Sequence, residues 1–334
     1  MGNIALGLNT LSNVRFADNQ ISSVYLGTNL VWSSYSYSYI LDLYPTSVHH
    51  AYSLRRLRSA YGGFCLRVRR TTTTPTVTTT TVDLSFDTTT NAITLNSAIT
   101  YVSGTATTAT NLGQFCASVV NGYSNPDGVN TNQNIFVVTW FDQSGNGKNP
   151  TNGTAGQQPR LVNAGNLELS GGKVAVRFTK TSSQNLTIAD TTANINNMSS
   201  YWVGAFVTLT NNQVGYSLAT VNRFYFPYFA TTNTLVAYNT SATAIQLDAG
   251  VSTNRKLYEL IAPSPSNSSV VQAWTNGTAK TTFAIASSFA TANIQLGTAA
   301  TLYFDGYIQE VIGYQSNANR LEKETNINSY WTIY

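Results

Sequence analysis

The stretch that decides the fold is residues 135–178, IFVVTWFDQSGNGKNPTNGTAGQQPRLVNAGNLELSGGKVAVRF. An apolar run, 135–141, leads directly into Asp142 and a Gln-Ser-Gly-Asn-Gly sequence. Two glycines within three residues favour a tight turn, because glycine adopts positive φ freely and the flanking Asp, Ser and Asn side chains bond nearby backbone. A Gly171-Gly172 turn then opens a run, 173–178, in which apolar and polar residues alternate. The stretch predicts strands joined by tight turns.

Short β-like runs recur through the rest of the chain and are separated by turn residues, which is the spacing of an all-β sandwich. They are 135–141, 173–178, 201–209, 214–219, 234–238, 256–262, 269–274, 281–285, 293–297 and 302–314. We therefore expect a sandwich body over residues 130–334.

Three segments carry a resemblance to known proteins: WFDQSGNG at 140–147, AYSLRRLRSAYGGFCLRVRR at 51–70 and YFDGYIQEVIGY at 303–314. They resemble concanavalin A-like (laminin-G-like) domains and the catalytic-domain family of the fungal arabinofuranosidase B. The resemblance covers residues 40–334 and implies a jelly-roll β-sandwich with a few short helices, including one at 319–330 and a final strand at 331–334. Such sandwiches serve as sugar hydrolases, lectin-like modules and parts of viral fibres.

The N-terminal segment, 1–34, is expected to be a separate module. Its end, ISSVYLGTNLVW at 21–32, predicts a hairpin, since apolar residues alternate on both sides of a Gly-Thr-Asn turn. It resembles the N-terminal hairpins of bacteriophage virion proteins, which implies that it anchors the chain to a particle, with 35–39 as a linker. The alternative is an extra hairpin packed on the sandwich. The anchoring residues would be Val24, Tyr25, Leu26, Leu30, Val31 and Trp32.

Residues 40–129 form a helix–strand part before the body. Apolar residues at helical spacing predict a helix over 49–61, ended by Gly62-Gly63 and followed by a strand through 64–69. The run TTTTPTVTTTTV, 71–82, predicts a hairpin or edge strand with a turn near Pro75. A short helix is expected over 112–120.

Composition excludes several classes of protein. Charged residues are 10% of the chain, against about 25% in an average soluble protein. Aromatic residues reach 12%, which is typical of a durable all-β extracellular or virion-surface protein and speaks against disorder. The net charge of +4 is too small to indicate nucleic-acid binding. One basic cluster stands out, and we interpret it as solvated or paired, with a phosphate-binding or protein-docking patch as the alternative: Arg55, Arg56, Arg58, Arg67, Arg69 and Arg70.

The two cysteines, Cys65 and Cys116, are expected to be buried thiols, with a bond between them as the alternative. The first residues lack the features of a signal peptide, and no apolar run is long enough to span a bilayer. We therefore expect no membrane partner. Asn-x-Ser/Thr sequences such as that at Asn152 arise by chance in a chain this rich in Asn and Thr.

A glycoside hydrolase is the alternative function. A retaining enzyme needs two carboxylates about 5 Å apart. The resemblance implies a nucleophile in an Asp-Tyr-Gly-Asn-Ala-Glu segment, but the corresponding stretch here, 201–229, holds no Asp, Glu or Cys. We therefore predict no catalytic residue. The carboxylates of the body are Asp142, Glu168, Asp190, Asp248, Glu259, Asp305, Glu310, Glu322 and Glu324.

No metal or cofactor site is indicated. Asp142 is interpreted as a cap for backbone amides of its turn, with a calcium or sugar contact as the alternative. His49 and His50 are adjacent at the start of the expected helix, where neighbours point in different directions, so they make a poor metal pair.

Sugar binding needs aromatic faces for stacking and polar side chains for the hydroxyl groups. The richest segment is Arg223-Phe-Tyr-Phe-Pro-Tyr-Phe229, although core packing is the favoured explanation of it. The candidate carbohydrate-binding residues are Trp202, Arg223, Tyr225, Tyr228 and Trp274. The sequence thus favours a non-enzymatic phage virion protein, a head or tail fibre or decoration subunit on the virion surface. Its expected partners are other virion proteins, host glycans and further copies of itself, and the expected oligomer is a homotrimer. A cellular lectin-like adhesin is a third hypothesis for the function.

Overall fold

The computed structural model describes residues 15–16, 19–20, 23–26, 29–33, 39–72, 78–129, 131–190, 198–210, 212–218, 224–231, 234–239, 243–249, 252–261, 270–280, 282–284 and 293–334. The chain divides into two compact units, Met1–Ser38 and Tyr39–Tyr334. In the first unit two antiparallel pairs are described, β1 (Arg15–Phe16) with β2 (Asn19–Gln20) and β3 (Ser23–Leu26) with β4 (Asn29–Ser33).

The hairpin predicted at 21–32 is confirmed. Strands β3 and β4 pair with Val24 opposite Trp32 and Tyr25 opposite Leu30. The backbone of the six proposed anchoring residues lies in these two strands, while their side chains lie outside the described part. Whether the hairpin anchors the chain stays a prediction.

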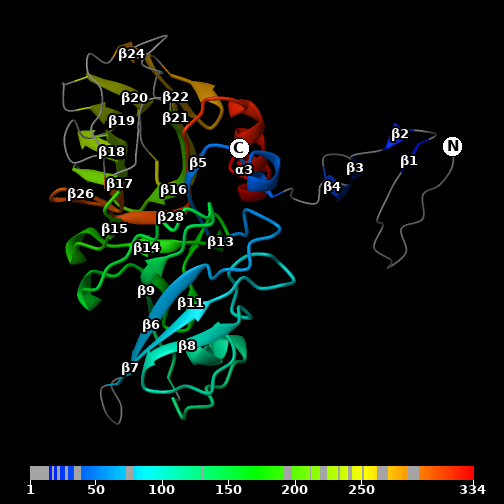
Figure 1. Ribbon diagram of the computed structural model, residues 1–334, viewed down its shortest axis with the longest axis vertical. Coiled ribbons are helices and arrows are strands. Elements are labelled where there is room, and N and C mark those ends of the chain that lie inside the picture. The colour runs from blue at the N-terminus through cyan, green and yellow to red at the C-terminus, as the bar shows by residue number, and fades with distance from the viewer. Residues whose placement is uncertain are drawn as a thin grey trace. The chain divides into compact units, whose positions relative to one another are not determined.

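The second unit is an all-β sandwich with a few short helices, as predicted (Figure 1). Within the described residues, one sheet has fourteen strands and the other has six. In Figure 1 the larger sheet runs the length of the unit, from β22 and β21 to β7 and β8, whereas β17–β20 lie at the end that carries β16 and β21. Side chains of both sheets share one hydrophobic core, which includes Trp202, Tyr216 and Phe178.

The larger sheet is ordered β23 (Thr278–Ala279), β22 (Val270–Thr275), β21 (Lys256–Ile261), β16 (Ser199–Phe206), β28 (Gly306–Tyr314), β14 (Val176–Phe178), β10 (Arg160–Asn163), β9 (Ile135–Trp140), β6 (Leu66–Thr72), β7 (Thr78–Leu84) and β8 (Ile99–Gly104). Beside this path β11 (Asn166–Leu167) pairs with β10, β24 (Phe283–Ala284) with β22, and β5 (Val48–Ser53) with β28. The six-stranded sheet is ordered β15 (Leu186–Ile188), β25 (Ile294–Leu296), β17 (Gln213–Leu218), β18 (Phe224–Thr231), β19 (Thr234–Asn239) and β20 (Thr243–Ala249).

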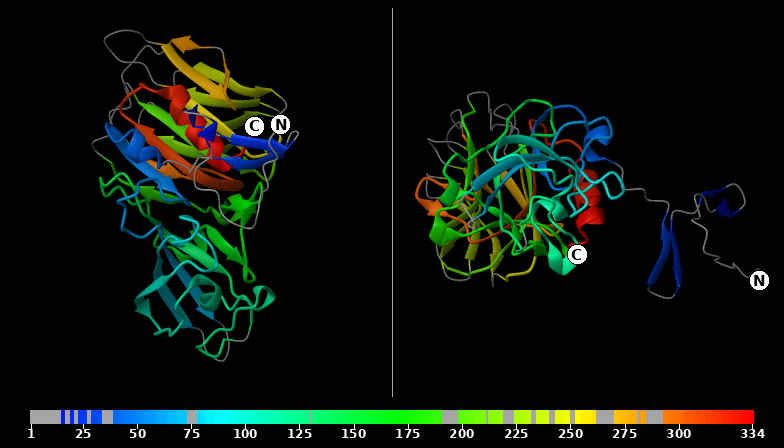
Figure 2. Two further views of the ribbon diagram at one scale, coloured as in Figure 1. Left: turned by 90° about the vertical axis from the view of Figure 1, so that its right-hand side faces the viewer. Right: turned by 90° about the horizontal axis from the view of Figure 1, so that it is seen from below.

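The remaining elements are small. Two further pairs join β12 (Leu169–Ser170) to β13 (Lys173–Val174) and β26 (Thr298–Ala299) to β27 (Leu302–Tyr303). The helices are α1 (Ile40–Leu43), α2 (Leu112–Phe115), α3 (Arg320–Trp331) and the 3-10 turns η1 (Val119–Asn121), η2 (Ala155–Gln157) and η3 (Lys180–Ser182). Helices α1 and α3 lie side by side (Figures 1 and 2). No helix of the described part is long and apolar enough to cross a membrane.

The helix predicted over 49–61 is wrong. Residues 48–53 form strand β5, which pairs antiparallel with β28 and is buried on both faces. A strand covered on both sides shows no alternation of apolar and polar residues, so the chance helical spacing of its apolar residues was misleading. Two smaller errors are the helix over 112–120, which ends at Phe115, and the final strand at 331–334, where Trp331 instead closes α3.

His49 and His50 are therefore strand residues, and both are buried. Their Nδ1 atoms lie 2.8 Å apart, and His50 Nε2 lies 2.8 Å from the hydroxyl of Tyr216 in the other sheet. Burial lowers the pKa of His49 to about 4, so the pair is neutral at neutral pH. The pair joins the two layers of the sandwich through hydrogen bonds.

The hairpin over the threonine run is confirmed, since β6 and β7 pair from Leu66–Leu84 to Thr72–Thr78. The residue named for its turn, Pro75, lies outside the described residues. Cys65 and Cys116 are both buried free thiols, as expected.

Three members of the arginine cluster form described ion pairs. Arg67 binds Asp83 with two hydrogen bonds of 2.7 and 3.0 Å, and Arg70 lies 3.2 Å from Asp127. Arg55 is 3% exposed and forms a two-pronged ion pair with the fully buried Glu310, at 2.8 and 3.0 Å. Its third nitrogen donates to Asn326 of α3. Arg55 thereby links the segment after β5 to both β28 and α3.

We predict that Arg55→Met destabilises the protein by about 3–5 kcal/mol, because Glu310 would stay buried without its partner. The double variant Arg55→Met/Glu310→Met should lose less, since it buries no unpaired charge. Arg67→Met is the control, because Arg67 is 36% exposed and its loss should cost about 1 kcal/mol or less. Chemical denaturation measures all three. Equal losses in the single and double variants would contradict the prediction.

Candidate functional site

The structure corrects one proposed sugar-binding residue, Trp202. Its side chain is fully buried and contacts the rings of Phe206, Tyr258 and Phe304. A ring enclosed by the core offers no face to a sugar. Trp202 therefore stabilises the sandwich.

The other proposed aromatic residues are not gathered at one place. Trp274 is half-buried in β22 of the larger sheet, where the guanidinium of Arg320 lies 4.2 Å from its ring centre. Tyr228 is half-buried in β18 of the smaller sheet. Tyr225 lies opposite Ser217 and Tyr238 by backbone register, and its side chain lies outside the described part. The whole of Arg223 lies outside the described residues.

The Asp142 turn is a structural connector, as the sequence favoured. The Asp142 carboxylate accepts hydrogen bonds from the backbone N–H groups of Ala51, Ser144 and Lys148 and from the Ser144 hydroxyl. Gln143 accepts from the N–H of Leu57 and donates to two carbonyl groups of the same segment. These bonds pair buried backbone N–H and C=O groups of β5 and of the segment that follows it, up to Leu57.

Other carboxylates of the body are held by cations. Asp190 accepts from Lys148 at 2.7 Å, and Glu310 binds Arg55. Glu168 binds Arg160 at 2.6 Å, and Asp305 binds Arg177 at 2.5 Å. Within the described residues no group of three or more His, Cys, Asp or Glu side chains is placed to hold a metal ion.

One pair of carboxylates lies close together, Glu259 of β21 and Glu324 of α3. Both accept hydrogen bonds from the same Arg320 nitrogen, and they are 0% and 5% exposed. Burial raises the pKa of Glu259 to about 8; Glu324 adds to the rise and Arg320 opposes it. The pair fastens α3 to the sheet and presents no open carboxylate to a substrate.

The most developed polar surface is a row of side chains across the larger sheet, which we call the arginine–aromatic row: Arg69, Phe136, Arg160, Arg177 and Tyr307. Backbone register places each member directly opposite the next, from β6 through β9, β10 and β14 to β28. Opposed residues of paired strands share a face of the sheet. All five are partly exposed, while their strand neighbours point into the core: Val68, Val137, Leu161, Val176 and Ile308.

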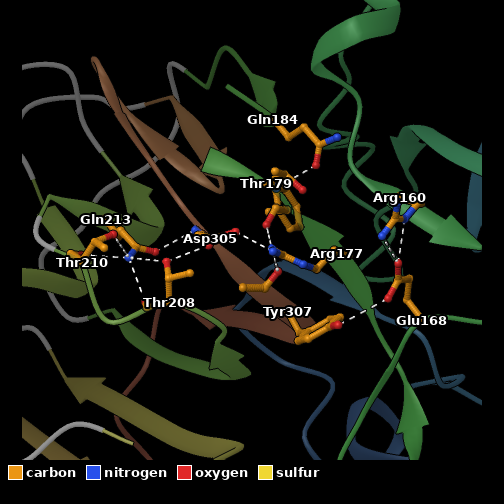
Figure 3. Close-up of polar contacts among 12 residues, drawn as sticks. Arg160, Glu168, Arg177, Thr179, Gln184, Thr208, Thr210, Gln213, Asp305 and Tyr307 are labelled. Atoms are coloured by element: carbon orange, nitrogen blue, oxygen red, sulfur yellow. Dashed lines mark hydrogen bonds and ion pairs between the residues drawn. The ribbon is translucent and has the colours of Figure 1, made fainter. Parts of the chain in front are cut away.

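Contacts hold the row in a fixed arrangement. The Arg69 guanidinium lies 4.9 Å from the ring centre of Phe136, and that of Arg177 lies 5.4 Å from that of Tyr307, within the range of cation–π attraction. The Tyr307 hydroxyl lies 3.4 Å from Glu168, the partner of Arg160 (Figure 3). The row therefore combines fixed aromatic rings with guanidinium donors.

Arg177 is held in place by Asp305, which is itself fixed by two further residues. Its partner Asp305 also accepts from the Thr208 hydroxyl at 2.6 Å, and its own N–H donates to Gln213, as Figure 3 shows. The sequence had identified Asp305 only as one of the carboxylates of the body. Its carboxylate orients an arginine of the row.

Sequence reasoning missed most of this row. Only Arg69 had been singled out, as a member of the basic cluster. The local signal was a charged residue between two apolar ones, as in Val176-Arg177-Phe178, but Arg69 is followed by Arg70 and Phe136 is itself apolar. That signal places each residue on a face, but the register between distant strands is needed to align them.

Comparisons with known proteins find distant likenesses only. Neither the family models nor the curated proteins contain a match. Among solved structures, a GH54 α-L-arabinofuranosidase is similar to 88% of this chain at 14% identity, with a TM-score of 0.48; the match spans 63% of that enzyme. A sialidase CBM40 module of Ruminococcus gnavus matches 42% of this chain and 94% of its own, at 13% identity and a TM-score of 0.32. Domain 4 of the arabinanase AbnA of Geobacillus stearothermophilus matches 46% of this chain and 75% of its own, at 15% identity and a TM-score of 0.36.

We predict that Glu259→Gln reduces the loss of folding stability that occurs as pH rises from 4.5 to about 8. The raised pKa means that the folded state holds a proton that the unfolded chain releases, so this group's contribution falls as pH rises from 4.5 to about 8. Melting temperatures from pH 4 to 9 should decline less steeply in the variant than in the wild type. Parallel curves for the two proteins would refute the assignment.

Proposed function

We propose that this protein is a non-enzymatic, glycan-binding component of a bacteriophage virion surface. The arginine–aromatic row is the observation that carries the binding part of the proposal. Aromatic rings stack on the apolar faces of sugars, and arginine donates several hydrogen bonds from one plane. Arginine and aromatic side chains are also the residues enriched at the energetic centres of binding surfaces.

The state of the carboxylates supports binding over hydrolysis. Hydrolysis of a glycosidic bond needs one carboxyl group as acid and a second as nucleophile or base, both facing the substrate. Glu168, Asp305 and Glu310 are each committed to an arginine, and Asp142 to backbone amides. The Glu259–Glu324 pair is buried.

The virion part of the proposal rests on residues 1–34. Their hairpin, β3 with β4, resembles those that seat phage proteins on a particle, and these residues belong to a compact unit separate from the sandwich. The unit would dock on capsid or tail proteins, leaving the sandwich to contact host glycans. A homo-oligomer, with a trimer as the first expectation, would multiply weak contacts by avidity.

The binding proposal predicts that the full chain retains oligosaccharides on a glycan array and releases no reducing sugar from them. Tyr307→Ala should weaken retention by about tenfold, through loss of one stacking ring. Tyr334→Ala, which removes an exposed tyrosine outside the row, is the matched control and should bind as the wild type does. Sugar release that Asp305→Asn abolishes would favour the glycoside hydrolase instead.

The anchoring proposal predicts that phage particles contain this protein and that removal of residues 1–34 prevents its incorporation. Mass spectrometry of purified particles measures both. The substitution Trp32→Ala should reduce incorporation, whereas Tyr334→Ala at the other end of the chain should not. Particles that incorporate the shortened chain normally would exclude an anchoring role for the segment.

A further inference from the structure

We propose that the arginine–aromatic row binds an acidic polysaccharide, with a carboxylate-bearing sugar at Arg69 and neutral sugar units extending toward Tyr307. This inference rests on the proposed glycan-binding function and adds the chemical class and direction of the ligand. It follows from the distribution of charge along the row.

Two of the three arginines are neutralised by the protein itself. Arg160 is paired with Glu168, and Arg177 with Asp305. Both acidic residues are buried, at 7% and 8% exposed, so these pairs are fixed parts of the surface. Near them the row offers rings and polar groups but no net charge. A neutral sugar unit suits that end.

Arg69 differs from the other two. Its three described hydrogen bonds go to neutral oxygens: the Gln158 amide at 2.5 Å, the Thr71 hydroxyl at 2.6 Å and the Ala155 carbonyl at 2.7 Å. No ion pair of Arg69 occurs within the described residues. Its guanidinium is therefore held in place with its positive charge uncompensated and with N–H donors left over from five. A carboxylate is the group that such a fixed guanidinium binds best.

The surface beyond Arg69 suits a sugar as well. Thr81 lies directly opposite Arg69, and Ser103 lies opposite Thr81, so two hydroxyl positions continue the row at its charged end. Strands are about 4.8 Å apart, and four strand steps separate Arg69 from Tyr307, so the row spans about 19 Å. That length accommodates an extended oligosaccharide of several units.

A nucleic acid is the less suitable ligand. Binding of its backbone depends on several lysine or arginine contacts to successive phosphates. The row offers one uncompensated cation, and the adjacent Arg67 is paired with Asp83. The buried Glu168 carboxylate beside Arg160 would also repel a second phosphate there.

The test compares a tetramer of galacturonic acid with its methyl ester, which has the same sugars without the charge. Calorimetric titration of the full chain should give an affinity for the acid at least about tenfold higher than for the ester. Arg69→Gln should abolish that preference, because it should weaken binding of the acid far more than binding of the ester. Tyr307→Ala should weaken both ligands alike. Lys280→Gln, which removes an equal charge elsewhere, should retain the full preference.

Two further variants and outcomes complete the test. Arg69→Lys keeps the charge and loses the planar fork, so it should show a reduced preference even if Arg69→Gln folds poorly. Equal affinity of the wild type for acid and ester, an unchanged preference in Arg69→Gln, or displacement of the tetramer by duplex DNA would overturn the inference. Glycans retained on the array, with weaker retention in Tyr307→Ala but no effect of Arg69→Gln, would overturn the inference alone. A wild type that binds no glycan would overturn the proposed function itself.

Discussion

The fold depends on satisfying one buried segment of polar backbone, residues 48–57. The backbone groups of a strand with both faces covered have little access to water as a hydrogen-bond partner. An unpaired buried N–H or C=O group therefore lowers the free energy of unfolding. On one side β28 supplies the partner strand. On the other side the side chains of Asp142 and Gln143 act as a substitute for a second strand, and they bind the backbone at Ala51, Ser53, Arg55 and Leu57. The turn that begins at Asp142 thus supplies the second set of hydrogen-bond partners for this buried segment.

The same segment is also linked to other elements by one charged side chain. Arg55 extends from its end to Glu310 in the closing strand and to Asn326 in the last helix. The first strand of the sandwich, its closing strand and its C-terminal helix are thereby tied at one point. Breaking such a buried pair from one side is costly, because the remaining charge cannot be hydrated.

The sequence predicted the fold well where local rules suffice. Every β-like run of the body contains a strand, although 173–178 and 302–314 each contain two and the strands β10, β18 and β20 were missed. The threonine hairpin forms because β-branched residues pair readily across two strands. Prediction failed at β5, whose burial on both faces hides the period of two, and at Trp202, where an aromatic residue proposed for a surface is in the core. Composition supplies aromatic residues but does not say which face of a strand is solvent.

The arginine–aromatic row marks the limit of reasoning from one sequence. Its members come from five strands spread between positions 69 and 307, and a shift of one residue in any strand would turn that member into the core. The alignment is therefore a property of the register, which the whole sheet enforces. In a chain with only 10% charged residues, most described cations of this surface have carboxylate partners, so a fixed cation without one is informative. Arg69 is such a cation: burial lowers its pKa, neutral oxygens hold it, and an anionic group from outside the chain would complete its electrostatic environment.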